Sequence, residues 1–265
     1  MSSPSLLDVL LRPGSLQAVF QPIFALGEDR GVRFVEGLIR GPFGTNAREA
    51  SVLFEYVRRK GKEVEFDRLC VRQVVASAAG LPAGLGLSVN IHASTLEYDR
   101  SFPDFLLHLA EASGIPAPGL IVEIVEHGQG FSGAGFSAAV RSLRDRGVGV
   151  ALDDVGCGQS SYRRMLDCQP QYFKVDRYLV HGCHGDPRRQ AILDSIAGLA
   201  RTFSSRVVAE GVERTADLET LRQLEIDFAQ GFLLAEPGPA SWLAVWSTDV
   251  SGYTPAISAV AAPPE

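Results

Sequence analysis

The chain has 265 residues, and its 25 Lys and Arg against 31 Asp and Glu give a formal net charge of −6. Hydrophobic residues make up 46% and charged residues 21%, a globular balance that argues against disorder over most of the length. No stretch approaches the roughly 18 consecutive apolar residues of a membrane span. The N-terminus lacks the basic lead-in of a secretory signal. We therefore expect a cytoplasmic protein that does not enter a membrane, and the acidic balance disfavours nucleic-acid polymers as partners.

Short apolar runs bounded by Gly or Pro alternate with longer helical patterns along the chain. In chain order, strands are predicted at Ala18–Phe24, Arg33–Ile39, Gly86–Ile91, Leu120–Val125, Val148–Leu152, Tyr172–Val175, Arg206–Ala209 and Asp227–Phe232. Between them, one or two helices are predicted in Ser51–Gly80, and single helices at Phe102–Ser113, Ser137–Arg146, Asp186–Phe203 and Thr215–Leu224. Eight strands alternating with helices predict a single-domain α/β fold, a TIM-like (β/α)8 barrel with parallel strands. A doubly wound open sheet shows the same alternation and stays the alternative.

Helix punctuation refines two of these elements. Pro187 suits the first turn of the helix at 186–203, where Ile192, Ile196 and Leu199 recur at helical spacing. Thr215 is the expected N-cap of the helix that it begins. For the domain organisation we expect an N-terminal extension at residues 1–16, one domain at 17–246 and a loose, Pro-containing tail at 247–265.

The four cysteines form no C-x-x-C pair, which favours free thiols in a reducing cytoplasm. Residues 181–184 read HGCH and hold three potential metal ligands, but their Gly and Pro neighbours favour a plain exposed turn over a zinc site. Cys157 follows a strand directly after two aspartates. We interpret it as a small buried filler rather than a redox-sensitive thiol.

Acidic and amide residues stand within or just after strand after strand. A single such carboxylate often caps the next helix, but the set spans most of the strands: Glu36, Asn90, Glu123, Asp153, Asp154 and Glu210. The flexible VGCG segment at 155–158 is expected to let both aspartates turn inward. Because the carboxyl ends of parallel barrel strands meet at one mouth, these carboxylates would crowd together and repel one another.

Divalent cations are the simplest remedy for such crowding, and we expect two of them. Oxygen-only ligands favour Mg²⁺ or Mn²⁺ over zinc. A pair of hard cations in a carboxylate cup suits phosphoester hydrolysis, because it neutralises charge on both the attacking and the leaving oxygens. Lys174 and Arg40 would then handle the phosphate.

Eight short motifs along the chain resemble, in order, those of EAL-domain phosphodiesterases, which hydrolyse cyclic di-GMP. They are FQPI at 20–23, EGLIR at 36–40, LSVNI at 87–91, VEIVE at 122–126, LDDVGCG at 152–158, FKVD at 173–176, AEGVE at 209–213 and QGF at 230–232. Any one motif is weak, whereas eight in register over residues 17–237 are specific. The resemblance implies the EAL barrel fold, a two-metal site for Mg²⁺ or Mn²⁺, hydrolysis of cyclic di-GMP to linear pGpG, and a homodimer.

The resemblance also implies roles for individual residues. It assigns the metal pair to the six residues already singled out: Glu36, Asn90, Glu123, Asp153, Asp154 and Glu210. Of the two glutamates in VEIVE, Glu123 is preferred for the metal and Glu126 for support. The catalytic set is Glu36, Asp154, Lys174 and Glu213, and Lys174 is the residue expected to contact the attacking water. Gln21, Leu38, Arg40 and Gln230 form the substrate-binding set, and Glu213 is expected to hold the loop after Asp154 and couple it to the dimer interface.

Three departures from the family pattern bear on activity. Gly37 replaces the Ala of the E-A-L triad, the segment 155–159 lacks the usual Phe, Thr and Tyr, and 41–44 lacks the usual Trp and His-Pro elements. A catalytically silent EAL module, which binds cyclic di-GMP or a protein partner, is therefore the main alternative. An unrelated metal-dependent barrel hydrolase is the weaker one. Because all the expected metal ligands are present, the sequence favours the enzyme, and we expect Ca²⁺ to occupy the site with little hydrolysis.

Overall fold

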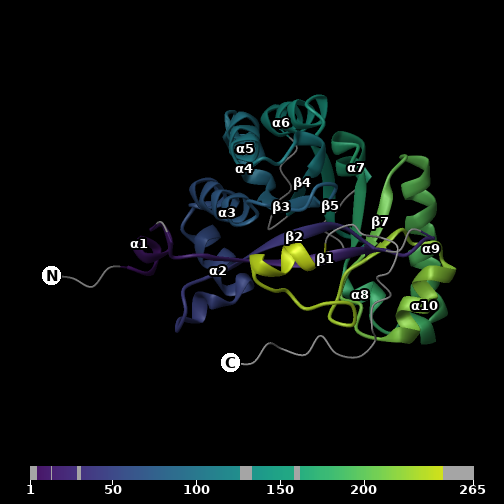
Figure 1. Cartoon of the computed structure of the whole chain (residues 1–265). Coiled ribbons are helices and arrows are strands. Elements are labelled where there is room, and N and C mark those ends of the chain that lie inside the picture. Colours follow the sequence, from purple (N-terminus) through teal and green to yellow (C-terminus); the bar gives the residue numbers. More distant parts are fainter. Residues whose placement is uncertain (1–4, 13, 29–30, 126–132, 158–161, 247–265) are drawn as a thin grey trace.

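The structure, a computed structural model, describes residues 5–12, 14–28, 31–125, 133–157 and 162–246. Eight strands close into a barrel in chain order (Figure 1). The strands are β1 Gln17–Ala25, β2 Val32–Arg40, β3 Gly86–His92, β4 Leu120–Val125, β5 Gly149–Val155, β6 Tyr172–Val175, β7 Arg206–Ala209 and β8 Phe228–Ala229. The (β/α)8 prediction is confirmed and the open sheet is excluded.

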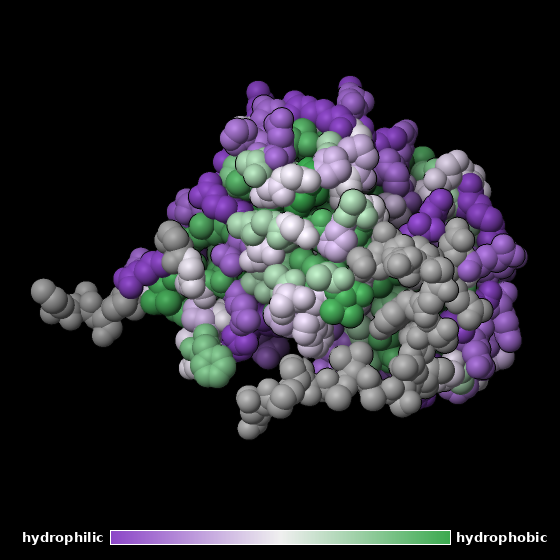
Figure 2. Space-filling view, viewed as in Figure 1, coloured by the Kyte–Doolittle hydropathy of each residue, from purple (hydrophilic) through white to green (hydrophobic). Residues whose placement is uncertain are grey.

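Helices surround the barrel on its outer side (Figure 1). They are α1 Leu6–Leu10, α2 Ala50–Arg59, α3 Glu63–Ser77, α4 Ala93–Tyr98, α5 Phe102–Ala112, α6 Ala134–Asp145, α7 Tyr162–Cys168, α8 Arg177–Val180, α9 Pro187–Thr202 and α10 Thr215–Gln223. In the view of Figure 2, hydrophilic residues cover the outer helices α6, α9 and α10, and more apolar residues show in the middle of the face. No helix among the described residues combines the length and apolarity that crossing a bilayer requires.

One strand corrects the predicted all-parallel barrel. β1 runs antiparallel to both of its neighbours, β2 and β8, whereas the pairs from β2 to β8 are parallel. The cause is the length of the first connection. β1 ends at Ala25 and β2 begins at Val32, which leaves room for a hairpin turn but not for the crossover of a dozen or more residues that parallel neighbours need.

Several helix details differ from the sequence expectation. Arg214 occupies the N-cap position of α10 without a side-chain bond, so Thr215 is not the cap. On α9 the buried face is formed by Leu193 and Ile196 with two alanines, whereas Ile192 is exposed. The helices α4, α7 and α8 were not predicted, and the expected extension at 1–16 contains α1, whose Leu10 is fully buried in the core. Short amphipathic stretches such as these carry too few turns to show a period.

The barrel interior is built in layers by the two-residue repeat of the strands. Outward-facing residues such as Val35 and Leu87 pack in clusters between the strands and the helices. A separate apolar cluster, called the lower layer here, fills the inside of the barrel near the starts of most strands: Ile23, Phe34, Ile121, Ala151, Tyr172, Val208 and Phe228. In the parallel strands, polar residues lie two positions after these apolar ones, so the next layer toward their carboxyl ends is different in kind.

Candidate active site

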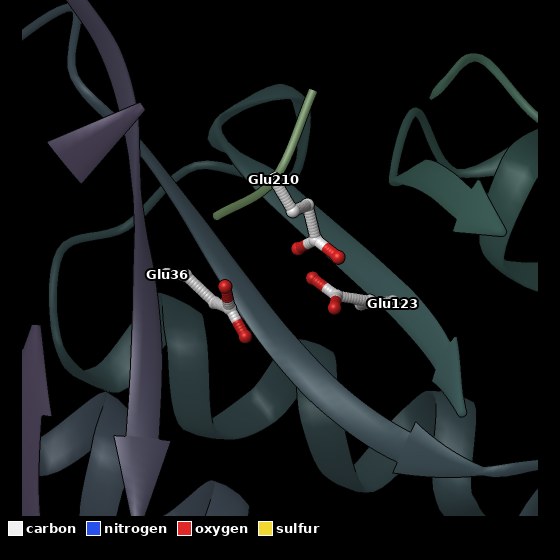
Figure 3. A group of neighbouring side chains, drawn as sticks. All are labelled: Glu36, Glu123 and Glu210. Carbon is white, nitrogen blue, oxygen red and sulfur yellow. The ribbon is translucent and has the colours of Figure 1, made fainter. Parts of the chain in front are cut away.

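Three glutamates from different strands converge above the lower layer. Glu36 lies in β2, Glu123 in β4, and Glu210 directly follows β7. Figure 3 shows their side chains pointing toward one another, and one carboxylate oxygen from each lies within 4.8 Å of the other two. Each glutamate follows a lower-layer residue by two positions, namely Phe34, Ile121 and Val208. The pleat therefore directs all three carboxylates into the barrel.

Lys174 of β6 lies among these carboxylates. Its fully buried ammonium nitrogen Nζ is 3.3 Å from Oε2 of Glu36 and 2.7 Å from Oε1 of Glu210, and it also pairs with Glu123. One ammonium thus supplies part of the neutralisation that the sequence argument assigned to metal ions alone. The acidic groups around it, Asp153 included, outnumber it, so a single ammonium cannot neutralise all of them in ionised form.

Amide groups hold Glu36 from two sides. Asn90 of β3 donates to Oε1 at 2.7 Å, and Gln230 donates to Oε2 at 2.8 Å. Gln230 also donates to Gln21 of β1 at 3.0 Å, and Gln21 donates in turn to the Ala235 carbonyl. The structure therefore places Gln21 and Gln230 as buried partners behind Glu36, not on the cavity wall.

The two aspartates at the end of β5 reach the same cavity by a backbone distortion. Adjacent strand residues point to opposite faces, so Asp153 and Asp154 would ordinarily separate. Asp154 has a φ of 53°, in the left-handed region, and the pairing of β5 with β6 shifts register between Leu152 and Val155. This distortion, rather than flexibility of the following segment, lets both side chains line the cavity.

The electrostatics of the cluster follow from burial and crowding. Burial raises the pKa of Glu123 well above its usual range, and the Glu36 charge adds to the shift. Burial likewise raises the pKa of Asp153 and brings that of Glu210 to about 8, although Lys174 opposes both shifts. For Glu36 the burial effect is outweighed by Lys174 and the two amide donors, and the pKa is lowered. Despite its burial, Lys174 has its pKa raised by the surrounding carboxylates.

A cavity of about 250 Å³ opens over this cluster. All six predicted metal ligands and Lys174 line it. Leu38, from the predicted substrate-binding set, also lines it, whereas Arg40 does not, and the Arg40 guanidinium instead donates to the Ile39 carbonyl at 3.2 Å. A cavity smaller than those that enclose a drug-sized ligand would take in only part of a dinucleotide.

Glu213 lies outside the cavity and contacts α8. Its carboxylate is 3.0 Å from Arg177 and 3.8 Å from His181. Asp176, the N-cap of α8, accepts from the Cys157 thiol at 3.4 Å, so Glu213 and the segment after Asp154 meet the same short helix. Residues 158–161, and also Glu126, lie outside the described residues.

Two predictions about cysteine-containing segments have clear outcomes. Cys157 is exposed, so its interpretation as a buried filler is wrong. Partial burial of the thiol and its bond to Asp176 raise its pKa to about 12, which disfavours the reactive thiolate as well. At 181–184, the Asp217 carboxylate accepts hydrogen bonds from the Gly182 and His184 amides and from the His184 ring. The segment is therefore a turn whose conformation this carboxylate stabilises.

Two further residues along β3, Ser88 and His92, were assigned no role from the sequence. The Ser88 hydroxyl donates to Oε2 of Glu123 at 3.2 Å, inside the barrel. His92 lines the cavity, and its ring Nδ1 and backbone amide bond to the buried Asp67 of α3 at 2.7 and 2.9 Å. Ser88, Asn90 and His92 share the two-residue repeat of the strand, and this alternation was the signal that could have found them.

The glycine of the EGLIR motif has a packing partner. A Cβ at Gly37 would lie 2.2 Å from Cγ1 of Val74, so β2 and α3 approach closely here. Val74 fills the space that an alanine at 37 would need. The substitution of Gly for Ala is thus matched across the interface, and Glu36 keeps its inward direction.

The fold and the site define a (β/α)8-barrel protein with an acidic cavity whose oxygen ligands suit divalent cations. The sequence matches the family model of the EAL domain over residues 6–237, and the chain belongs to that family.

Relatives and solved structures agree with this assignment. The chain is 32% identical over 63% of its length to the probable cyclic di-GMP phosphodiesterase PdeG of Escherichia coli, covering 32% of that protein. It is 29% identical over 88% of its length to the cyclic di-GMP phosphodiesterase NbdA of Pseudomonas aeruginosa, covering 30% of it. The chain therefore spans about a third of the length of these relatives.

Among solved structures, a standalone EAL protein from Vibrio cholerae in its c-di-GMP bound form has a TM-score of 0.75 at 25% identity. The match covers 85% of this chain and 93% of that one. BlrP1 of Klebsiella pneumoniae, in a complex with calcium and cyclic di-GMP, has a TM-score of 0.75 at 27% identity, covering 90% of this chain and 59% of that one.

Proposed function

We propose that the protein is a metal-dependent phosphodiesterase that hydrolyses cyclic di-GMP to linear pGpG. The observation that carries the proposal is the convergence of Glu36, Glu123 and Glu210 around Lys174 in one cavity. Membership of the EAL family and the names of the relatives support the choice of substrate.

The residues present fit a pair of hard divalent cations. The ligand group that converges in the cavity consists of carboxylates, with the Asn90 amide beside it, whereas His92 and Cys70 line the wall without belonging to that group. Such oxygen ligands favour Mg²⁺ or Mn²⁺. We assign the ligands to Glu36, Asn90, Glu123, Asp153, Asp154 and Glu210. When bound, such cations would offset the excess of carboxylate charge and stabilise negative charge on the phosphoryl oxygens.

Hydrolysis adds water across one phosphodiester. The water oxygen forms a bond to phosphorus, the bond from phosphorus to O3′ breaks, and a proton ends on the released O3′ hydroxyl. Because the surrounding carboxylates keep Lys174 protonated, we infer that it acts through its charge and its N–H donors, on the attacking water and the phosphate. Lys174 is therefore not the base.

Neighbouring residues complete the site. We assign the amides of Gln230 and Asn90 to positioning Glu36, and Gln21 to positioning Gln230. Leu38 forms part of the apolar wall beside the scissile phosphate. Arg40 would have to leave the Ile39 carbonyl to reach the part of the dinucleotide outside the cavity.

We further propose that the protein is a cytoplasmic homodimer. The large apolar side chains of Tyr162, Leu166 and Tyr178 are 65–76% exposed and lie on α7 and α8. Glu213 contacts α8 and would connect the site to that surface. Sedimentation of the full chain tests this assembly, and a monomer at all concentrations would contradict it.

The test of the activity is incubation of the purified chain with cyclic di-GMP and Mn²⁺ or Mg²⁺, followed by chromatography. We expect pGpG with either cation, none with EDTA, and little with Ca²⁺ alone, because the larger ion accepts looser coordination. Binding of cyclic di-GMP without product would identify the catalytically silent module instead. If neither binding nor product is observed, the result favours a different phosphoester as the substrate.

A further inference from the structure

A second, larger cavity lies at the opposite end of the barrel. It has a volume of about 1000 Å³, at the upper end of ligand pockets (roughly 300–1,000 Å³). It is bounded by the first residues of β2 to β7, by Phe228 at the start of β8, and by the loops at 81–86 and 114–119. The lower layer separates it from the acidic cavity. We call it the N-terminal cavity.

The charge of this cavity is opposite to that of the molecule. Arg33, Arg144 and Arg206 line it, and none of its described lining residues is a carboxylate. The charged residues of this otherwise mostly apolar lining are thus all basic, in a chain whose net charge is −6. Asp227 does not line the cavity. Its carboxylate accepts from the Val207 amide at 2.8 Å, and its charge also acts on Tyr172.

Arg206 is the arginine whose donors are best placed for a ligand. It is exposed, and its guanidinium lies 5.8 Å from the centre of the Phe228 ring. Arg144 already donates through Nη1 to Oε1 of Gln169 at 2.9 Å and to the Cys168 carbonyl at 3.4 Å, so it contributes mainly its charge. Neither arginine forms an ion pair within the described part of the chain. An anion would therefore meet two guanidinium groups, those of Arg144 and Arg206, that have no ion-pair partner among the described residues.

An aromatic surface lies next to these charges. Tyr172 and Phe228 have ring centres 6.0 Å apart, and Phe34 lies 5.2 Å from Tyr172 and 5.7 Å from Phe228. Tyr172 is half-buried, and burial together with the Asp227 charge raises the pKa of its hydroxyl, although Arg206 and Arg33 oppose that shift. On the other side, Leu81 and Pro82 contribute apolar wall. Phe34 and Phe228 are buried, so a flat ring would pack mainly against Tyr172 and the apolar wall, with its anionic group toward Arg206.

We propose that the N-terminal cavity binds an organic anion that joins a phosphate to an aromatic ring, the chemistry of a mononucleotide. The guanidinium groups would hold the phosphate and the aromatic and apolar wall would hold the ring. The volume of the cavity is that of a pocket for a small ligand, which favours such a ligand over a polymer. The proposal does not depend on hydrolysis of cyclic di-GMP, since it uses none of the acidic residues at the other end.

The test is calorimetric titration of the full chain with GMP, in buffer containing EDTA so that metal-dependent binding at the acidic cavity is suppressed. Inorganic phosphate and guanosine are titrated separately. We expect GMP to bind more tightly than either part, and added salt to weaken it. Arg206→Gln should weaken GMP binding at least about tenfold, because it removes a charged donor, and Arg206→Lys should weaken it less.

Two controls locate the binding. Arg201→Gln changes an exposed arginine of α9 outside the cavity, and Arg40→Gln changes an arginine at the carboxyl end of β2. Both should leave GMP affinity unchanged. The proposal is overturned if GMP does not bind, if phosphate alone binds as tightly, or if Arg40→Gln weakens binding as much as Arg206→Gln. Circular dichroism confirms that each variant is folded.

Discussion

The two layers inside the barrel are formed by the same strands, but one is apolar and the other consists of charged and amide side chains. Phe34, Tyr172 and Val208 pack against one another in the lower layer, and Glu36, Lys174 and Glu210 follow them at a distance of two residues. β1 obeys the same rule in reverse. Because it is antiparallel, Ile23 belongs to the lower layer and Gln21, two residues earlier, to the polar layer.

The lower layer stabilises the fold, and the polar layer carries the chemistry. Burying the lower layer removes apolar surface from water and stabilises the fold. Burying the polar layer costs free energy, because carboxylates lose hydration and repel one another around a single ammonium. The barrel therefore places a layer that lowers the stability of the fold directly next to one that raises it. Variants in the two layers should have opposite consequences.

Removing a lower-layer ring should have the largest effect on folding. Phe34→Ala is expected to reduce the free energy of unfolding by about 3–5 kcal/mol, the usual cost of deleting a buried aromatic side chain. Urea unfolding measures it. The hydrolytic rate of the folded fraction should change only a few fold. A decrease in the free energy of unfolding of less than about 1 kcal/mol would contradict the conclusion that this layer stabilises the fold.

Changing a polar-layer carboxylate should abolish function and leave the fold. Glu36→Gln keeps the shape but removes the charge that faces Lys174, and we expect pGpG production to fall more than about a hundredfold, beyond the loss typical of supporting residues. Its urea midpoint should stay close to that of the wild type. Glu219→Gln, which changes an exposed glutamate of α10, is the matched control. An equal loss of pGpG production in this variant would contradict a specific role of Glu36 in the reaction.

The pH dependence of stability should reveal the strain in the polar layer. The pKa of Glu210 rises from 4.5 to about 8 in the folded protein. Between these values the folded state holds a proton that the unfolded state has lost, so metal-free stability should fall as pH rises from about 4.5 to about 8. Thermal melts in EDTA measure this, and Glu210→Gln should flatten the slope. A slope unchanged in that variant would contradict the assignment.

The smallest effect is expected for a positioning hydroxyl. Ser88→Ala removes the 3.2 Å bond to Glu123, and about a tenfold loss of turnover is the expected scale for a residue that supports a metal ligand. The apparent Mn²⁺ affinity should fall with it, which a purely structural role would not produce. Ser88→Thr keeps the hydroxyl and should restore part of both. Full activity of Ser88→Ala would show that the hydrogen bond from Ser88 to Glu123 does not contribute to turnover.

The set of polar residues was predictable because strand periodicity and short motifs are local. Leu120–Val125, Tyr172–Val175 and Arg206–Ala209 were predicted with the bounds that the structure has. Their inward residues Glu123 and Lys174, and Glu210 at the end of β7, meet in the cavity as expected. The reversal of β1 was also within reach, since its connection to β2 is too short for a crossover.

Other features required the packed molecule. That Lys174 would pair with three glutamates, and that Arg40 would turn to a backbone carbonyl, depends on side-chain directions that no linear pattern specifies. The left-handed Asp154 that brings two adjacent aspartates to one cavity is a backbone outlier held by its surroundings.

By itself, the sequence determined the alternation of strands and helices, the order of the motifs and the list of carboxylates that face inward, because each depends on residues a few positions apart. Only the tertiary structure decided how those charges neutralise one another and that seven strand starts together enclose a basic cavity. Both depend on closure of the barrel, which brings residues distant in the chain within a few ångströms and removes the water that would otherwise screen them.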